Sequence, residues 1–414
     1  MWSPRTLLHG RHRHATLALG RDPAYDARMP QSNPPRVVLI HNFLPPHRVP
    51  LFEELATRFN LDVWILGAIK SVREWDEPDT PSDARIRSLP RITLGLGSRY
   101  NALLLNYSLP KALRQARPDV LICCGWDTPA AFYAAWWARR TGTPFIVWSG
   151  STPAENTRLR RMTQSLVRWY VQSAQAWLAY GSRSKDYLVE LGADADGTFI
   201  AHNTVDIAYY NANSRIADDT AQESRERWGL GDRKVILFVG NLLKLKGVHE
   251  LVEAFALLLE THSDTKLLLV GEGDERGALE QRVAEYDLAN QVAFTGFLNR
   301  EAIATCYGLA DLLVLPSHSE VWGLVINEAL ASGVPVLATD VCGAVADLIE
   351  DGVNGYVVPS GNAEAIETAM ARHFDAPETH AHMRDAARKS IGEFTFAAAA
   401  DAFGQAVAGA LVRP

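Results

Sequence analysis

The feature that most constrains the fold of this chain is a regular alternation between two hydrophobic periods. From Arg36 onward, short apolar runs rich in β-branched residues alternate with longer segments in which apolar residues recur every three or four positions. This alternation is typical of βαβ units, in which helices connect parallel strands. We therefore predict an α/β protein built on parallel sheets.

The alternation forms two series, separated by a polar stretch at 211–233 that we interpret as a connection between lobes. The first series has expected strands at 36–42, 61–67, 119–125, 144–150, 176–181 and 198–203, and the second at 234–240, 266–273, 291–297, 311–317, 334–340 and 354–360. With 414 residues, 47% of them hydrophobic, the chain has more apolar material than one core normally uses. The prediction is two Rossmann-like, doubly wound lobes facing across a cleft, at 35–207 and 208–390.

The two ends of the chain depart from this pattern. Residues 1–34 are rich in arginine and lack the apolar core of a signal peptide, so we predict a disordered basic extension. Met29 offers an alternative start codon just before the folded pattern begins. Residues 391–414 are predicted to end in an alanine-rich amphipathic helix, whose partner the sequence does not identify.

Composition argues against several classes of function. A net charge of -7 offers no electrostatic reason to propose a nucleic acid partner. No pair of cysteines has the spacing of a zinc site or a redox dithiol, which favours a reducing, cytoplasmic setting; the four are Cys123, Cys124, Cys306 and Cys342. The most membrane-like stretch, 120–138, is divided by Asp127 and Pro129, so no transmembrane helix is predicted.

The most specific motif lies at 319–328, where Glu320 and Glu328 stand eight residues apart on either side of Gly323. A glycine at this position lets the backbone approach a ligand closely, and the free N–H groups of a helix start favour an anion. The alternative is a helix that carries surface glutamates in its first turns, where the helix dipole favours them.

This segment resembles the E-x7-E donor-site motif of the retaining family 4 glycosyltransferases, and the run at 316–340 resembles that family along its whole length. The resemblance implies the two-lobed GT-B fold. It also implies that Glu320 contacts the donor sugar near the reacting centre and that Glu328 binds the ribose hydroxyls of the nucleotide. Backbone groups of Trp322, Gly323, Leu324 and Val325 would meet the sugar and the phosphates.

A second motif, at 240–247, resembles the G-R-L-x-x-x-K-G signature of the same family. Lys246 matches the lysine that neutralises the leaving diphosphate, and a fixed cation is the group that such charge development requires. Asn241 stands where the family commonly has arginine, so one expected cation is missing or is replaced by Lys244. The alternative is that both lysines belong to a solvated loop.

Two further donor-side features are weaker. Gly271 and Gly273 match the G-x-G with which a family strand ends, although such glycines are common in any doubly wound fold. Residues 294–297 match the loop that borders the nucleotide base, which makes Phe297 a candidate contact. An aromatic pair at a strand end also serves core packing.

Candidate acceptor-side residues follow strands of the first series. His47 and Arg48 lie in a proline-rich turn that resembles one subgroup of the family, and they could reach the cleft or serve turn packing. Ser149 and Ser151 stand where many relatives have a histidine, and Trp126 follows the preceding strand. Asp127 could orient an acceptor hydroxyl or act as its base, or it could cap the next helix.

A basic, apolar segment at 158–170 has two interpretations. Its apolar residues recur at helical spacing between arginines, so the helix could rest on an anionic membrane near a lipid-linked acceptor. The alternative is a surface helix that packs this face on its own sheet.

Together these features predict a retaining glycosyltransferase that moves a hexose-type sugar from a nucleoside diphosphate to an acceptor hydroxyl in polysaccharide, glycolipid or glycoside biosynthesis. No cofactor is expected, and no aspartate pair suggests a metal under the diphosphate. The protein is expected in the cytoplasm, with peripheral contact at the inner face of the membrane as an option. The alternatives are a weakened GT-B protein that acts as a binding partner, motivated by Asn241, and a nucleotide-sugar epimerase of the same fold.

Overall fold

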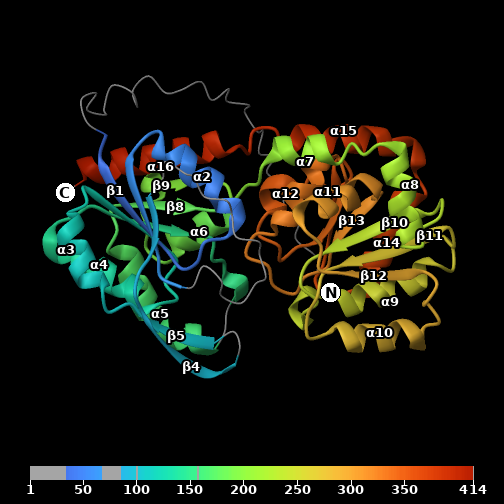
Figure 1. The fold of residues 1–414 in the computed structure, drawn as a ribbon, viewed down its shortest axis with the longest axis horizontal. Coiled ribbons are helices and arrows are strands. Elements are labelled where there is room, and N and C mark those ends of the chain that lie inside the picture. Colours follow the sequence, from blue (N-terminus) through green and yellow to red (C-terminus); the bar gives the residue numbers. More distant parts are fainter. Residues whose placement is uncertain (1–33, 68–84, 99–100, 156–157, 414) are drawn as a thin grey trace, which may run out of the picture.

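The structure is a computed structural model of the chain and describes residues 34–67, 85–98, 101–155 and 158–413. It consists of two lobes, each with its own parallel sheet (Figure 1). Nearly all of the extension predicted at 1–34 lies outside the described residues. Each of the twelve predicted strands overlaps a strand of the structure.

The N-terminal lobe contains a seven-stranded sheet with the order β3-β2-β1-β6-β7-β8-β9 and only parallel pairings. Its strands are β1 (Arg36–His41), β2 (Asn60–Ile65), β3 (Arg85–Ser88), β6 (Val120–Cys124), β7 (Phe145–Ser149), β8 (Ala176–Ala179) and β9 (Thr198–Ile200). One face packs against residues of α3 (Leu109–Ala116), α4 (Pro129–Thr141), α5 (Arg158–Gln172) and α6 (Ser182–Glu190). The other face packs against α2 (Val49–Ala56) and the last helix, α16 (Phe396–Val412).

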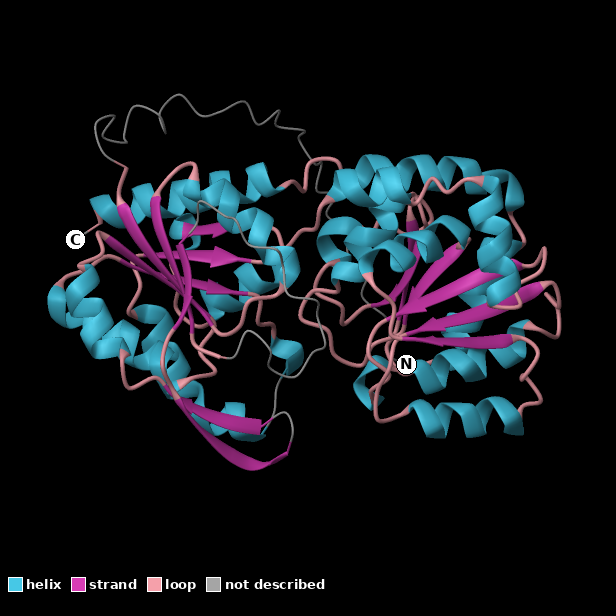
Figure 2. Ribbon diagram, viewed as in Figure 1, coloured by secondary structure: helices cyan, strands magenta, loops and turns pink. Residues whose placement is uncertain are grey.

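The C-terminal lobe contains a six-stranded parallel sheet with the order β12-β11-β10-β13-β14-β15. Its strands are β10 (Lys234–Val239), β11 (Thr265–Val270), β12 (Val292–Gly296), β13 (Leu312–Leu315), β14 (Val336–Thr339) and β15 (Gly355–Val358). Its helices are α9 (Val248–Leu258), α10 (Arg276–Glu285), α11 (Arg300–Leu309), α12 (Leu324–Ser332), α13 (Val345–Leu348), α14 (Ala363–Phe374) and α15 (His380–Ile391). Strand arrowheads of both sheets point toward the junction between the lobes (Figure 2).

The polar stretch at 211–233 is not simply a connection between lobes. It overlaps the end of α7 (Ile207–Asn213) and contains α8 (Asp218–Arg227), and both helices pack against α11 of the C-terminal lobe. The helix α8 was not predicted because it has no buried residue, so its sequence shows no apolar face. The antiparallel hairpin of β4 (Ile92–Ser98) and β5 (Asn101–Leu105) was also not predicted.

The last helix returns to the first lobe. After α15, the chain crosses over, and α16 packs against α2, β8 and β9 (red in Figure 1). Among the described residues, one helical segment, Pro377–Val412, is long and apolar enough to cross a membrane by length and composition. It includes the break between α15 and α16, and residues of α16 form part of the N-terminal core, as a helix of a folded domain does.

Candidate functional site

The loops after β10 and β13 bring the two most specific motifs together. The Lys246 ammonium forms an ion pair with the Glu320 carboxylate, and each side chain is less than one-fifth exposed. Lys246 ends a short 3-10 turn, η4 (Lys244–Lys246), and a side chain at the next residue, Gly247, would collide with the carbonyl of Pro316. Glycine at 247 therefore lets the two loops touch and holds the lysine beside the glutamate.

The helix start predicted after Gly323 is present. Gly323 has a φ of 96°, a left-handed conformation that favours glycine, and α12 begins at the following residue, Leu324. The side chain of Trp322 is buried and donates a hydrogen bond of 2.9 Å to Asn327, whereas Leu324 and Val325 are half-buried. Trp322 thus uses its indole for packing, which is compatible with the backbone contact that the resemblance implies.

The other residues of the first donor loop lie near its surface. Asn241 and Lys244 are exposed, and the described ion pairs of this region include Lys246 but not Lys244. Gly271 and Gly273 have a packing role, since side chains there would overlap the backbone of Gly240 and Leu242. These glycines allow the loop after β11 to support the loop that carries Lys246.

Glu328 lies in a cluster that the sequence did not reveal. The Tyr307 hydroxyl donates a hydrogen bond of 2.8 Å to its carboxylate, and Tyr210 and Arg300 lie beside it. Burial raises the pKa of Glu328 to about 7, although the hydroxyls and Arg300 act in the opposite direction. Tyr210 comes from α7, a helix that was not predicted because its end falls in the polar stretch at 211–233.

Phe297, the candidate contact for the base, follows β12 and is 54% exposed. The preceding Gly296 has a φ of 75°, and Phe294 is partly buried against the core with Arg276 over its ring. The two aromatic residues therefore differ, since Phe294 serves packing and Phe297 is available to a ligand.

The acceptor-side candidates separate into buried and accessible residues. Trp126 is only 6% exposed and packs edge-on against Tyr170, so its ring belongs to the lobe core. Ser149 is buried and accepts a hydrogen bond of 3.2 Å from the backbone of Ser151, while His47 and Ser151 are half-buried.

Asp127 is exposed at the end of β6, and it is not the cap of α4. Thr128 occupies that position, and its hydroxyl accepts a hydrogen bond of 3.3 Å from the backbone of Ala131. The capping alternative for Asp127 was wrong by one residue, because both residue types are good caps and only the backbone geometry distinguishes them.

Arg48 is buried rather than extended into the solvent. It ends the turn η1 (Pro46–Arg48), and its guanidinium lies 4.4 Å from the ring centre of Trp148 and 4.7 Å from that of Tyr180. Both aromatic residues stand at the carboxyl ends of strands, Trp148 in β7 and Tyr180 just after β8.

The first turn of α6 joins the lobes. The Ser182 amide donates a hydrogen bond of 3.0 Å to Asp347 of α13, and its hydroxyl donates another. Burial opposes ionisation of Asp347, but hydrogen bonds from His202 and Ser182 outweigh it and hold its pKa below the ordinary value. The neighbouring Gly181 lies so close to Trp322 that a side chain there would overlap the indole. The donor segment is therefore in direct contact with the N-terminal lobe.

Two sequence families match this chain. Residues 51–209 match the family described as Glycosyltransferase Family 4, and residues 220–390 match Glycosyl transferases group 1. Alpha-D-kanosaminyltransferase of Streptomyces kanamyceticus is 33% identical over 382 residues, which are 85% of this chain and 95% of that protein. The chain belongs to the family 4 glycosyltransferases. D-inositol 3-phosphate glycosyltransferase of Streptomyces griseus is 29% identical over 272 residues, which are 61% of this chain and 56% of that protein.

Solved structures agree with the fold of this glycosyltransferase. The Anabaena protein Alr3699/HepE in complex with UDP superposes with a TM-score of 0.70 at 20% identity, covering 88% of this chain and 97% of its own. Sucrose-phosphate synthase from Thermosynechococcus elongatus gives a TM-score of 0.70 at 21% identity, and the superposition covers 89% of this chain and 98% of that protein. The fold is GT-B, as the sequence predicted.

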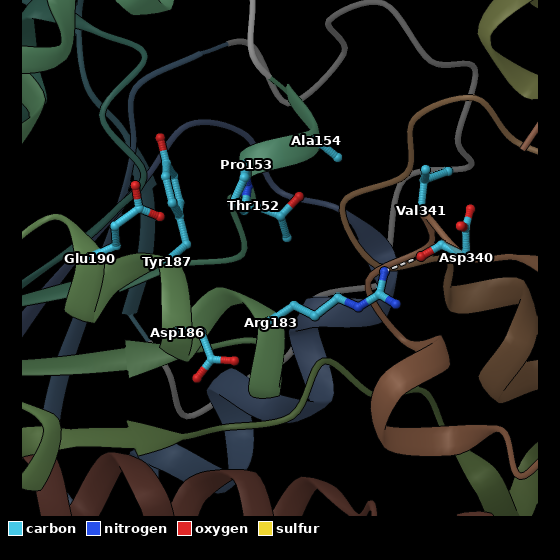
Figure 3. A pocket seen from close by; sticks show the side chains of 9 residues that line it. All are labelled: Thr152, Pro153, Ala154, Arg183, Asp186, Tyr187, Glu190, Asp340 and Val341. Atoms are coloured by element: carbon cyan, nitrogen blue, oxygen red, sulfur yellow. Dashed lines mark hydrogen bonds between the residues drawn. The ribbon is translucent and has the colours of Figure 1, made fainter. Parts of the chain in front are cut away.

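A cavity of about 400 Å³ lies between the lobes of this glycosyltransferase, beside α6 (Figure 3). Arg183 from α6 reaches across it and donates hydrogen bonds to the carbonyls of Asp340 and Cys342 in the opposite lobe. Neither Arg183 nor Asp340 was a predicted site residue. The available signal was that Asp340 directly follows β14 and Arg183 lies in the first turn of the helix after β8, because ligands of open α/β sheets bind at strand carboxyl ends.

The basic segment at 158–170 forms α5 and packs only in part. Val167, Tyr170 and Val171 are buried in the core, whereas Met162 is 84% and Leu166 47% exposed. The packing alternative is therefore confirmed for the second half of the helix. Within the described ranges, no group of three or more His, Cys, Asp or Glu residues could hold a metal ion.

Proposed function

We propose that this family 4 glycosyltransferase transfers a hexose-type sugar from a nucleoside diphosphate to an acceptor hydroxyl with retention of the anomeric configuration. The observation that carries the proposal is the Lys246–Glu320 pair, held beside the start of α12 by the touching loops. UDP and UDP-glucose occupy crystal structures of Alr3699/HepE, which supports a nucleotide-sugar donor here.

The chemistry follows from the charges at this site. As the bond to the leaving diphosphate breaks, negative charge grows on its oxygens and positive charge on the sugar ring. In this proposal Lys246 and the helix start stabilise the diphosphate, and Glu320, the ion-pair partner of Lys246, contacts the sugar. Donor binding must replace part of the Lys246–Glu320 attraction, since both groups then face the substrate.

The acceptor would enter from the N-terminal lobe. Asp127, exposed at the end of β6, is our candidate for orienting the acceptor hydroxyl or accepting its proton. One relative is named for the transfer of a kanosaminyl group and another for the glycosylation of D-inositol 3-phosphate, whose ring carries several hydroxyls, which favours a hydroxyl-rich acceptor. A cytoplasmic location agrees with four free cysteines, and the exposed Met162 and Leu166 agree with peripheral membrane contact.

A thermal-shift screen tests the donor assignment. We expect one nucleotide among UDP, GDP, ADP and dTDP, with its sugars, to raise the melting temperature selectively, because a ligand that binds only the folded state stabilises it. The shift should disappear in Glu328→Ala. A wild-type protein that responds to none of these nucleotides would contradict the proposal.

Donor binding should also depend on pH through Glu328. A neutral carboxyl group cannot accept hydrogen bonds from both the Tyr307 hydroxyl and the ribose as fully as a carboxylate can, so the ionised form binds the donor better. Because the pKa is about 7, affinity should be about tenfold higher at pH 8 than at pH 6. Titration with the intact nucleotide sugar, whose phosphates do not titrate in this range, measures the effect. Glu328→Gln should bind weakly with no such pH dependence, and an equal pH slope in that variant would exclude Glu328 as the cause.

A further inference from the structure

Arg48 is a buried cation packed against two aromatic rings. The side chain is 4% exposed, and its guanidinium lies 4.4 Å from the ring centre of Trp148 and 4.7 Å from that of Tyr180. The two rings contact each other edge-on, with 5.5 Å between their centres, so the guanidinium lies over the corner that they form. The ring of Tyr180 in turn lies against the backbone of Gly150, where any side chain would overlap it. Its neighbours therefore hold the guanidinium in one orientation.

The charge of Arg48 has no anionic partner in the described part of the chain. Ion pairs in which the N–O distance is at most 4.0 Å include Arg36 and Arg58 of the same lobe, but none includes Arg48. His41, Cys124 and Tyr180 lie beside it, and the Asp127 carboxylate acts on the same Cys124 thiol as Arg48 does. Burial and the nearby Arg48 lower the pKa of His41 to about 3, and burial raises the pKa of the Cys124 thiol to about 11.

An unpaired buried charge is unfavourable in the free protein. Contact with two aromatic rings compensates for part of the lost hydration, but an apolar side chain of similar volume would fill the same space without that cost. A cation kept in such a place is suited to a ligand that supplies the missing anion when it binds.

Arg48 and its two aromatic neighbours lie at the junction between the lobes. Tyr180 packs against the hydrophobic cores of both lobes, and the next residue, Gly181, contacts Trp322 in the donor segment. Arg48 itself ends the loop after β1, so it stands at the sheet edge from which substrates are approached.

We propose that Arg48 is an oxyanion-binding residue of the N-terminal lobe, which pairs with a phosphate or carboxylate group of a substrate bound in the cleft. The inference rests on the proposed function. The anion has two possible sources, the diphosphate of the donor or an acidic group on the acceptor. Either source favours the planar guanidinium, because lysine cannot bind an oxyanion through two parallel N–H groups.

The test compares Arg48→Met with Arg140→Met as a matched control. Arg140 is exposed near the end of α4, away from strand carboxyl ends, and its replacement changes the net charge equally. Without anions, Arg48→Met should melt at the wild-type temperature or above. Its affinity for the bound anion should fall about 10- to 100-fold, the loss expected for a charge-assisted contact, and Arg140→Met should retain full affinity. Arg48→Lys, which keeps the charge, should lose less.

Two titrations distinguish the sources of the anion. The first uses the nucleoside diphosphate selected among UDP, GDP, ADP and dTDP, and the second uses inorganic phosphate with that nucleotide at saturation. Weaker nucleotide binding in Arg48→Met assigns the diphosphate, whereas a loss of phosphate binding alone assigns the acceptor group. Equal affinities in wild type and Arg48→Met for both ligands, or a lower melting temperature with unchanged binding, would overturn the proposal.

Failure of the proposed function gives a different result, because wild type itself would then bind no nucleotide. Inorganic phosphate alone would still test Arg48 in that case. Phosphate binding that depends on Arg48 would keep the inference, and its absence would end it.

Discussion

Lys246→Met is expected to lower the rate of donor cleavage about 100- to 1,000-fold, the effect of removing one fixed charge from a developing anion. Lys246 forms an ion pair with Glu320, beside the start of α12. Release of the nucleoside diphosphate by slow hydrolysis of the donor measures the effect without any knowledge of the acceptor. A rate within a few-fold of wild type would exclude Lys246 from the proposed role.

Two lysine variants control this experiment. Lys389→Met removes an exposed charge on α15 and should leave the rate unchanged. Lys244→Met tests whether the exposed neighbour replaces the arginine absent at Asn241. We expect a smaller loss than for Lys246, because Lys244 forms no ion pair with Glu320. Melting temperatures should stay close to wild type in all three, since partly exposed ion pairs contribute little to stability.

Phe403→Ala is expected to lower the free energy of unfolding by about 3–5 kcal/mol, the cost of truncating a fully buried aromatic side chain. Phe403 lies in α16 and is fully buried, with its ring edge-on to Trp148 at 5.0 Å between centres. Denaturant unfolding followed by circular dichroism measures the change. Because a two-lobed protein can unfold in more than one step, the loss should appear in the transition of the N-terminal lobe.

Leu411→Ala in the same helix is the matched control. This residue is 42% exposed, so its truncation should cost about 0.5 kcal/mol or less. Equal losses in the two variants would mean that α16 is not part of the N-terminal core. An intermediate that lacks the N-terminal lobe in Phe403→Ala would show, in contrast, that the end of the chain completes the first domain.

The twelve strands expected from the sequence were found because a parallel strand covered on both faces needs an apolar run. The strand β3 was missed because it lies at the sheet edge, where none of Arg85, Ile86, Arg87 and Ser88 is buried. The polar helix α8 was missed because none of its residues is buried either. Local periodicity reports burial, so it identifies only the elements that the core covers.

The donor site divides in the same way. Glu320, Gly323 and Lys246 follow strands and were predicted, since the carboxyl ends of parallel strands meet at one edge. Tyr307, Tyr210 and Arg300, which surround Glu328, come from α11, α7 and the start of α11. Nothing in their local sequence shows that they meet, because their proximity depends on how the helices pack.

By itself, then, the sequence determined the α/β class, the two series of strands and the loops that carry the donor motifs, because periodicity and turn residues act over a few neighbours. Only the tertiary structure decided that α16 completes the first lobe, that Ser182 donates a hydrogen bond to Asp347 of the other lobe and that Arg48 packs against Trp148 and Tyr180. These contacts join residues far apart in the chain. Their partners are selected by shape and charge after folding brings the surfaces together.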